Sequence, residues 1–65
     1  MKIACVLGGS GFLGSHVADK LSDAGYQVRI FDQRSSPWIR PDQEMMLGNL
    51  LNQNEVNEAI HGAEV

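Results

Sequence analysis

GGSGFLG, at residues 8–14, is the stretch that decides the fold. It follows the apolar run at residues 3–7 and opens a segment whose apolar residues recur at helical spacing. A buried strand, a glycine-rich turn and an amphipathic helix, in that order, form a phosphate-binding arrangement. Glycine is needed because a side chain would hold the backbone away from a pyrophosphate, and because the turn can require positive φ. The start of the helix adds free N–H groups and the positive end of a dipole.

The residues around this turn predict a βαβ unit. Residues 2–7 predict a strand, and because residues 3–7 are continuously apolar, we expect this strand to be buried on both faces. Residues 12–24 predict a helix, and Gly25 stands where a C-terminal cap belongs. The core-facing stripe of this helix is expected to consist of Leu13, Val17, Leu21 and Ala24. Residues 27–32 predict a second strand, parallel to the first and joined to it by a right-handed crossover.

The second half of the chain continues the α/β pattern. Residues 33–43 contain two prolines and predict a loop, with room for one helical turn around Trp38. Residues 44–48 predict a short third strand. Residues 52–61 predict a helix in which Asn52 is the cap and Glu55 completes a capping box. The last residues, 63–65, have the composition of the approach to a fourth strand. The expected fold class is α/β: the N-terminal half of a Rossmann-type doubly wound parallel sheet, in the order β-α-β-loop-β-α.

Composition excludes several classes of function. The 65 residues carry a formal net charge of -3 and no basic stripe, which argues against nucleic acid as a partner. The apolar run near the N-terminus is too short for a signal peptide or a membrane span, so we expect a cytoplasmic protein without membrane contact. Cys5 is the only cysteine and fits a buried thiol. Together with His16 and His61 it has no metal-ligand spacing, so no metal site is expected.

An acidic residue at the end of the second predicted strand indicates that the phosphate-binding turn belongs to a dinucleotide site. The glycines satisfy both G-x-G-x-x-G and G-x-x-G-x-x-G, and Asp32 lies 18 residues beyond Gly14. A carboxylate there can accept hydrogen bonds from the adenosine ribose. It would repel a 2′-phosphate, which favours NAD over NADP, although Arg34 could pair with that phosphate. The alternative is a tight glycine turn without a ligand.

Four ordered landmarks resemble the extended short-chain dehydrogenases/reductases, in particular the NAD-dependent nucleotide-sugar epimerase and dehydratase group. They are Gly8-Gly9-Ser10-Gly11-Phe12-Leu13-Gly14-Ser15-His16, Gly25-Tyr26-Gln27-Val28, Phe31-Asp32 and Gly48-Asn49-Leu50. The third residue of the family's Gly-Asp-Leu/Ile signature is kept, whereas Asn49 replaces the usual aspartate.

The resemblance implies a role for individual residues. The backbone around Gly11, Phe12 and Leu13 would contact the pyrophosphate. Asp32 would bind the adenosine ribose. Asn49 would accept a hydrogen bond from the adenine amino group through its side-chain oxygen, and the alternative is that it is only a turn residue. Leu50 would pack on the adenine face, and the alternative is that it belongs to the core. The whole expected cofactor set is Gly8, Ser10, Gly11, Phe12, Leu13, Gly14, Asp32, Gln33, Arg34, Asn49 and Leu50.

Other conspicuous side chains are expected to be structural. His16 lies on the first turns of the first helix, where a structural hydrogen bond is the simpler role. Glu55 and Glu58 are expected to form a solvated helix face rather than a catalytic pair. Trp38 could cover the adenine side of the site or pack against the sheet.

The family's catalytic Tyr-x-x-x-Lys is absent from these residues, since Tyr26 is followed four residues later by Ile30. No catalytic residue is therefore assigned, and residues 1–65 are expected to be a partial NAD(P)-binding domain that stops before the fourth strand. The expected function is to bind the adenosine and pyrophosphate of NAD within an oxidoreductase or isomerase acting on a nucleotide sugar. The alternatives are a non-catalytic NAD(P)-binding module and a fragment without independent function. Without its fourth strand, the first strand would be an exposed edge that favours self-association.

Overall fold

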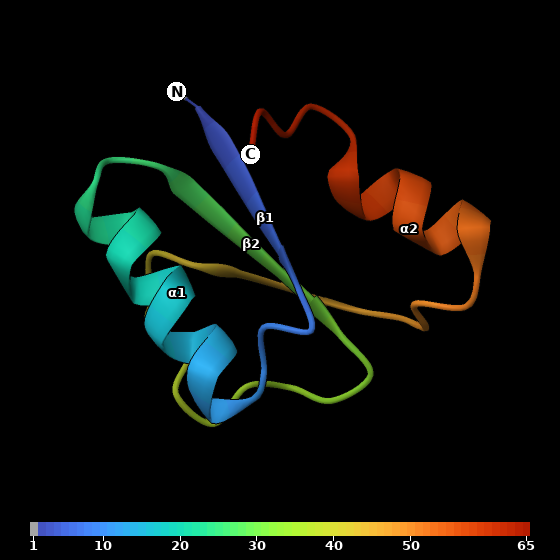
Figure 1. Ribbon diagram of the computed structural model, residues 1–65, viewed down its shortest axis with the longest axis horizontal. Helices are drawn as coiled ribbons and strands as arrows, with labels where there is room; N and C mark the ends of the chain where they lie inside the picture. The colour runs from blue at the N-terminus through green and yellow to red at the C-terminus, as the bar shows by residue number, and fades with distance from the viewer. Residues whose placement is uncertain (1) are drawn as a thin grey trace.

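Three parallel strands and two helices make up the fold. The computed structural model describes residues 2–65. The elements follow in the order β1 (Ile3–Leu7), α1 (Phe12–Asp23), β2 (Gln27–Asp32), β3 (Glu44–Leu47) and α2 (Gln53–Ile60). The sheet has the order β1-β2-β3, and α1 and α2 lie on opposite sides of the strands (Figure 1). This arrangement confirms the predicted N-terminal half of a Rossmann-type sheet.

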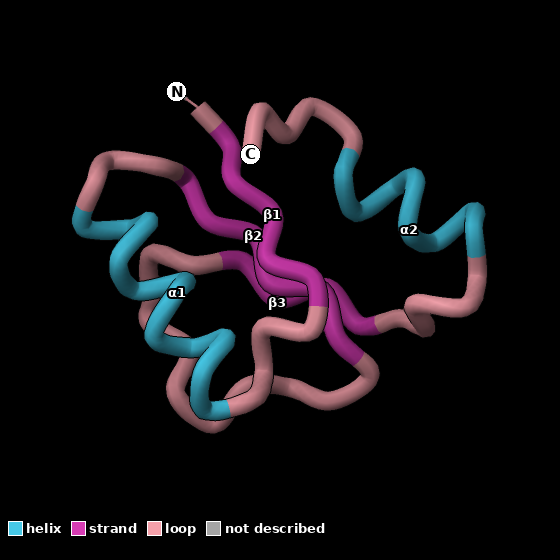
Figure 2. Tube along the Cα trace, viewed as in Figure 1, coloured by secondary structure: helices cyan, strands magenta, loops and turns pink. Residues whose placement is uncertain are grey.

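The register of the sheet brings the carboxyl ends of all three strands to one edge. Leu7 at the end of β1 pairs with Phe31, and Leu47 at the end of β3 pairs with Asp32. The segments that leave β1, β2 and β3 therefore start beside one another (Figure 2). Ligands of open α/β sheets bind at this edge.

Helix α1 packs on the sheet through its small residues, which differs from the predicted apolar stripe. Ser15 and Ala18 are its buried residues, and Ala18 forms a core cluster with Val28 and Ile30. Leu13, expected in the core, is 78% exposed. Leu21, by contrast, is half-buried and packs against this cluster, as predicted. At the start of the helix the tight turn brings the backbone close to the sheet, so small side chains take the inner positions there.

The end of α1 confirms the predicted glycine cap. Gly25 has a φ of 97°, and its N–H donates to the carbonyl of Ser22 at 3.0 Å. The N–H of Tyr26 donates to the carbonyl of Leu21 at 3.1 Å. These two bonds form a Schellman motif, which ends the helix and turns the chain into β2.

Helix α2 lies on the other side of the strands from α1 (Figure 1). Its cap is Asn52, whose side-chain oxygen accepts from the N–H of Glu55 at 3.2 Å, as the capping-box spacing predicts. Its buried residue is Ala59. At its far end, the Nη1 of Arg29 on β2 donates to the carbonyls of Ala59 at 2.7 Å and His61 at 3.1 Å. The guanidinium thus satisfies carbonyls that the helix leaves unpaired.

The segment 33–43 is a loop, as predicted, with a turn at residues 37–38 and no helix. Arg40 fastens it to α1 by ion pairs with Asp19 at 3.1 Å and Asp23 at 2.9 Å. The amide nitrogen of Gln43 adds hydrogen bonds to Asp19 and Ser22. The loop is therefore held against the helix that follows the glycine turn.

The free edge of β1 is partly covered by the end of the chain. Ala63 forms a parallel bridge with Ile3, and the N–H of Cys5 donates to the carbonyl of Val65 at 2.8 Å. These contacts cover part of the edge, so the expectation of a fully exposed β1 edge was wrong at Ile3 and Cys5. The expectation that β1 is buried on both faces was also wrong, because Ala4 alone among its residues is fully buried. Among residues 2–65, no helix has the length and apolarity needed to cross a membrane.

Candidate functional site

The glycine turn is packed so tightly that two of its glycines have no room for a side chain. A Cβ on Gly14 would stand 2.7 Å from the Cα of Gly9 and 2.9 Å from the carbonyl oxygen of Gly8. A Cβ on Gly9 would stand 2.9 Å from Cγ2 of Ile30. Gly8 has a φ of 75°, and its N–H donates to the carbonyl of Phe31 at 2.7 Å. These glycines bring the start of α1 down onto the sheet.

Gly11 differs from these glycines because it borders open space. It is the N-cap of α1, and a Cβ built on it would meet no atom within 4 Å. No side chain caps the helix there, and its first turn holds no acidic residue. The start of α1 therefore presents backbone N–H groups and the positive end of the helix dipole to an open surface. This donor set fits an anion such as a pyrophosphate.

Ser10 joins the glycine turn to the segment after β2. Its N–H donates to Oδ2 of Asp32 at 3.1 Å, and its Oγ donates to the carbonyl of Arg34 at 2.5 Å. The other carboxylate oxygen of Asp32, Oδ1, accepts from the N–H of Gln33 at 2.6 Å. Each carboxylate oxygen keeps a further lone pair for an outside donor. The acid is thus oriented by backbone groups beside the start of α1.

A pocket of about 360 Å³ lies next to this acid. Its lining residues are Gln33, Gly48, Asn49 and Glu55, which follow β2, follow β3 and belong to α2. The N–H of Gly48 donates to the carbonyl of Asp32 at 2.9 Å, which ties the pocket to the acid. Gly48 has no room for a side chain, because a Cβ would stand 2.5 Å from the ring of buried Phe31.

Asn49 and Glu55 form the polar wall of the pocket. The N–H of Asn49 donates to Oε2 of Glu55 at 2.6 Å, and Oδ1 of Asn49 accepts from the N–H of Leu51 at 2.9 Å. The expectation that Glu55 belongs to a solvated face was wrong, since this side chain is half-buried and turned to the pocket; Glu58 is exposed as expected. The capping-box spacing indicated that Glu55 reaches back past the helix start, but not that it reaches the turn after β3.

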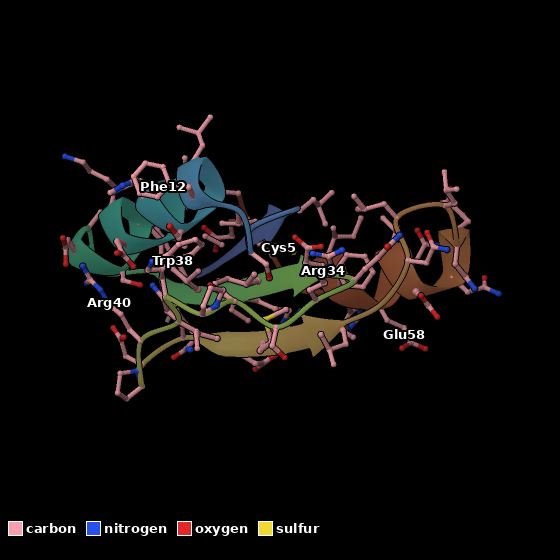
Figure 3. The ribbon with its side chains drawn as sticks, turned by 90° about the horizontal axis from the view of Figure 1, so that it is seen from below. Cys5, Phe12, Arg34, Trp38, Arg40 and Glu58 are labelled. Carbon is pink, nitrogen blue, oxygen red and sulfur yellow. The ribbon has the colours of Figure 1, made fainter. Side chains whose placement is uncertain are left out.

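The apolar residues of the expected site lie on the surface. Phe12 is 67% exposed and meets the ring of Trp38 edge to face, with ring centroids 5.9 Å apart (Figure 3). Its ring also meets that of His16 at 4.5 Å, so the role found for this histidine is an aromatic contact. Leu13 and Leu50 are exposed as well, which removes the alternative of a core role for Leu50. These side chains line the open edge instead of filling the core.

Other potential reactive groups lie away from this edge. Cys5 is half-buried on β1, and burial raises the pKa of its thiol, with smaller opposing effects of Arg29 and Glu44. A second cavity, of about 420 Å³, is lined by Asn57, Glu58 and His61 on α2 and the turn after it. Over residues 2–65, no group of three or more His, Cys, Asp or Glu side chains is arranged to hold a metal ion.

Comparisons with known proteins agree with the geometry of this edge. The model of the NAD dependent epimerase/dehydratase family matches residues 4–65. Sterol-4-alpha-carboxylate 3-dehydrogenase, decarboxylating, from Mus musculus is 38% identical over 61 residues, which are 94% of this chain and 17% of that protein. 3-beta-hydroxysteroid dehydrogenase from Mycolicibacterium neoaurum is 35% identical over 60 residues, 91% of this chain and 16% of that protein. A crystal structure of UDP-galactose 4-epimerase superposes with a TM-score of 0.60 and 40% identity, covering 72% of this chain and 16% of that one.

Proposed function

The chain belongs to the NAD-dependent epimerase/dehydratase family, and we propose that it binds the adenosine and pyrophosphate part of NAD. The family requires a nicotinamide dinucleotide, and this chain corresponds to its N-terminal, dinucleotide-binding segment. The observation that carries the proposal is the position of Asp32, whose carboxylate is oriented by Ser10 beside the uncapped start of α1.

Three neighbouring features supply the contacts. The N–H groups at the start of α1, around Gly11, Phe12 and Leu13, hold the pyrophosphate. Asp32 accepts hydrogen bonds from the adenosine ribose through its remaining lone pairs. The pocket beside Gln33 and Asn49 takes the adenine, because its lining residue Gln33 directly follows Asp32, the proposed ribose ligand.

NAD is the preferred cofactor in this proposal. A 2′-phosphate on the ribose would meet the carboxylate of Asp32, and like charges at hydrogen-bond distance repel each other. Arg34 is exposed and could offset part of that repulsion. We therefore expect NADP to bind more weakly than NAD, but still measurably.

The whole protein is proposed to be a cytoplasmic oxidoreductase or isomerase that acts on a nucleotide sugar. The chain spans 16–17% of the length of the relatives described above, and we propose that residues 1–65 are one part of a larger Rossmann domain. When bound, the nicotinamide ring supplies a hydride acceptor and donor. The chain's own residues bind and orient the other half of the cofactor.

Self-association of the 65-residue chain is also proposed. Ala63 and Val65 pair with β1 only beside Ile3 and Cys5, and Leu7 at the end of the strand is 46% exposed. An apolar strand edge left open invites pairing with a second chain. Sedimentation velocity over a range of concentrations is expected to show dimers or larger species, and a monomer at all concentrations would contradict this.

Calorimetric titration with NAD tests the proposed site. Asp32→Asn keeps the shape of the side chain but removes its charge, so we expect NAD affinity to fall about tenfold, as for loss of a charge-assisted hydrogen bond. Asp42→Asn is the matched control, because this exposed acid lies in the loop away from the glycine turn. Equal affinity of the Asp32→Asn variant and the unmodified chain would overturn the assignment.

A further inference from the structure

Glu55 brings a carboxylate from α2 into the turn after β3. Its Oε2 accepts from the N–H of Asn49 at 2.6 Å and lies 2.8 Å from the point where a Cβ on Gly48 would stand. The carboxylate is thus pressed against the backbone of that turn. Since Gly48 and Glu55 both line the 360 Å³ pocket, the negative charge stands at its wall.

The pocket wall otherwise offers amide groups. Oδ1 of Asn49 already accepts from the N–H of Leu51 at 2.9 Å, so one lone pair of this oxygen is used within the turn. Oε1 of Glu55 accepts no hydrogen bond from the residues that the structure describes. The strongest acceptor available to a ligand in this pocket is therefore the carboxylate of Glu55, because an ionised acceptor forms the stronger hydrogen bond.

We propose that Glu55 is the residue that selects adenine, by accepting a hydrogen bond from its exocyclic amino group. The inference rests on the proposed function, and it moves to position 55 a role that the resemblance assigns to position 49. Adenine presents an amino donor where hypoxanthine presents a carbonyl acceptor. An ionised carboxylate only accepts hydrogen bonds, so it attracts the first group and repels the second.

The test compares NAD with nicotinamide hypoxanthine dinucleotide, which differs in that one group. By calorimetry, the unmodified chain is expected to bind NAD about tenfold more tightly, the factor for one charge-assisted hydrogen bond. In Glu55→Gln the amide can donate as well as accept, so the ratio of the two affinities should fall to about one to two. The matched control is Glu58→Gln, which removes the same charge from the exposed face of the same helix and should leave the ratio near ten.

A second variant separates Glu55 from Asn49. Asn49→Ala removes the side-chain amide but keeps the backbone N–H that donates to Glu55, so the preference for NAD should persist in it. Loss of the preference in Asn49→Ala but not in Glu55→Gln would overturn the inference. A ratio near one in the unmodified chain would overturn it without any variant, while NAD binding itself would leave the proposed function intact. If neither dinucleotide binds the unmodified chain, both the inference and the proposed function are wrong.

Discussion

The backbone N–H of Ser10 lies 3.1 Å from Oδ2 of Asp32, although 22 residues separate them in the sequence. The bond joins the glycine turn after β1 to the end of β2. The Oγ of Ser10 reaches further, to the carbonyl of Arg34 at 2.5 Å. One residue of the turn thereby holds both the acid and the backbone that follows it, so the proposed pyrophosphate and ribose contacts belong to one rigid unit.

Substituting Ser10→Ala tests how much this connection contributes. The variant loses the bond from Oγ to Arg34 but keeps the N–H that donates to Asp32. We expect NAD affinity to fall about threefold, in line with one neutral hydrogen bond that positions a loop. Calorimetry of Ser10→Ala against Ser35→Ala, an exposed serine in the loop that follows β2, measures the effect. A loss as large as that of Asp32→Asn would show that the hydroxyl does more than position the loop.

Two alanine substitutions in the glycine turn should differ in their consequences, one lowering stability and the other NAD affinity. Gly14→Ala would place a methyl group 2.7 Å from the Cα of Gly9 and 2.9 Å from the carbonyl oxygen of Gly8, and these backbone atoms cannot rotate away as a side chain could. We expect it to lower the free energy of unfolding by about 1–3 kcal/mol, as for other overpacked positions. Urea denaturation followed by circular dichroism measures this.

Gly11→Ala is the counterpart, because the added methyl group would meet no atom within 4 Å. We expect its stability to change by less than about 1 kcal/mol, the difference between Gly and Ala at an N-cap. Its NAD affinity should nevertheless fall, because the methyl group occupies space that the pyrophosphate needs. Unchanged affinity would remove Gly11 from the proposed binding surface.

The order of elements was predictable from the sequence, but the packing of α1 was not. Helical spacing of Leu13, Val17 and Leu21 indicated the helix correctly, but of these three only Leu21 packs against the core, whereas Leu13 and Val17 are exposed. Spacing reports which residues share a face, whereas the distance between helix and sheet decides which face is buried. Here the contact of Gly14 with Gly9 brings the two so close that Ser15 and Ala18 take the inner positions.

The position of Asp32, the proposed ribose ligand, was predictable from the sequence, whereas the position of Glu55 in the wall of the adjoining pocket was not. Asp32 stands directly after a recognisable strand, at a fixed distance beyond the glycines, so its position at the sheet edge follows from the topology. Glu55 lies in the first turn of α2, and its carboxylate accepts from the N–H of Asn49, six residues earlier. The capping-box pattern places that acceptor at the N–H of the cap residue Asn52, so the spacing did not indicate the contact with the turn after β3.

Arg29 is expected to anchor α2 to the sheet. Its side chain is 17% exposed, and its Nη1 donates to carbonyls of Ala59 and His61 at the end of the helix. Arg29→Met keeps much of the volume but leaves those carbonyls without the charged donor, so we expect a loss of about 2 kcal/mol in the free energy of unfolding. Hydrogen exchange should quicken most in α2. Lys20→Met, on the exposed surface of α1, should change neither, and equal exchange rates in α2 would contradict this role.

The reactivity of Cys5 should depend on folding. Burial raises the pKa of its thiol above the ordinary value of 9.0, so less thiolate is present in the folded chain at a given pH. Alkylation by iodoacetamide should therefore have its midpoint above pH 9.0 in buffer and return to the ordinary value in urea. The buried thiol therefore contributes fully to the free energy of unfolding below the ordinary pKa, and this contribution is lost as pH rises through the raised pKa of the folded state. Identical midpoints in buffer and urea would contradict the burial of this thiol. The Cys5→Ser variant is the control for alkylation at groups other than this cysteine.

Titration of the 65-residue chain with the two halves of NAD tests whether this chain binds the adenosine and pyrophosphate half of the cofactor. Calorimetry would compare NAD, ADP-ribose and nicotinamide mononucleotide under the same conditions. With the pyrophosphate at the start of α1, the ribose at Asp32 and the adenine beside Glu55, ADP-ribose should bind about as tightly as NAD. Nicotinamide mononucleotide should give no heat of binding. Binding of nicotinamide mononucleotide without binding of ADP-ribose would contradict this placement.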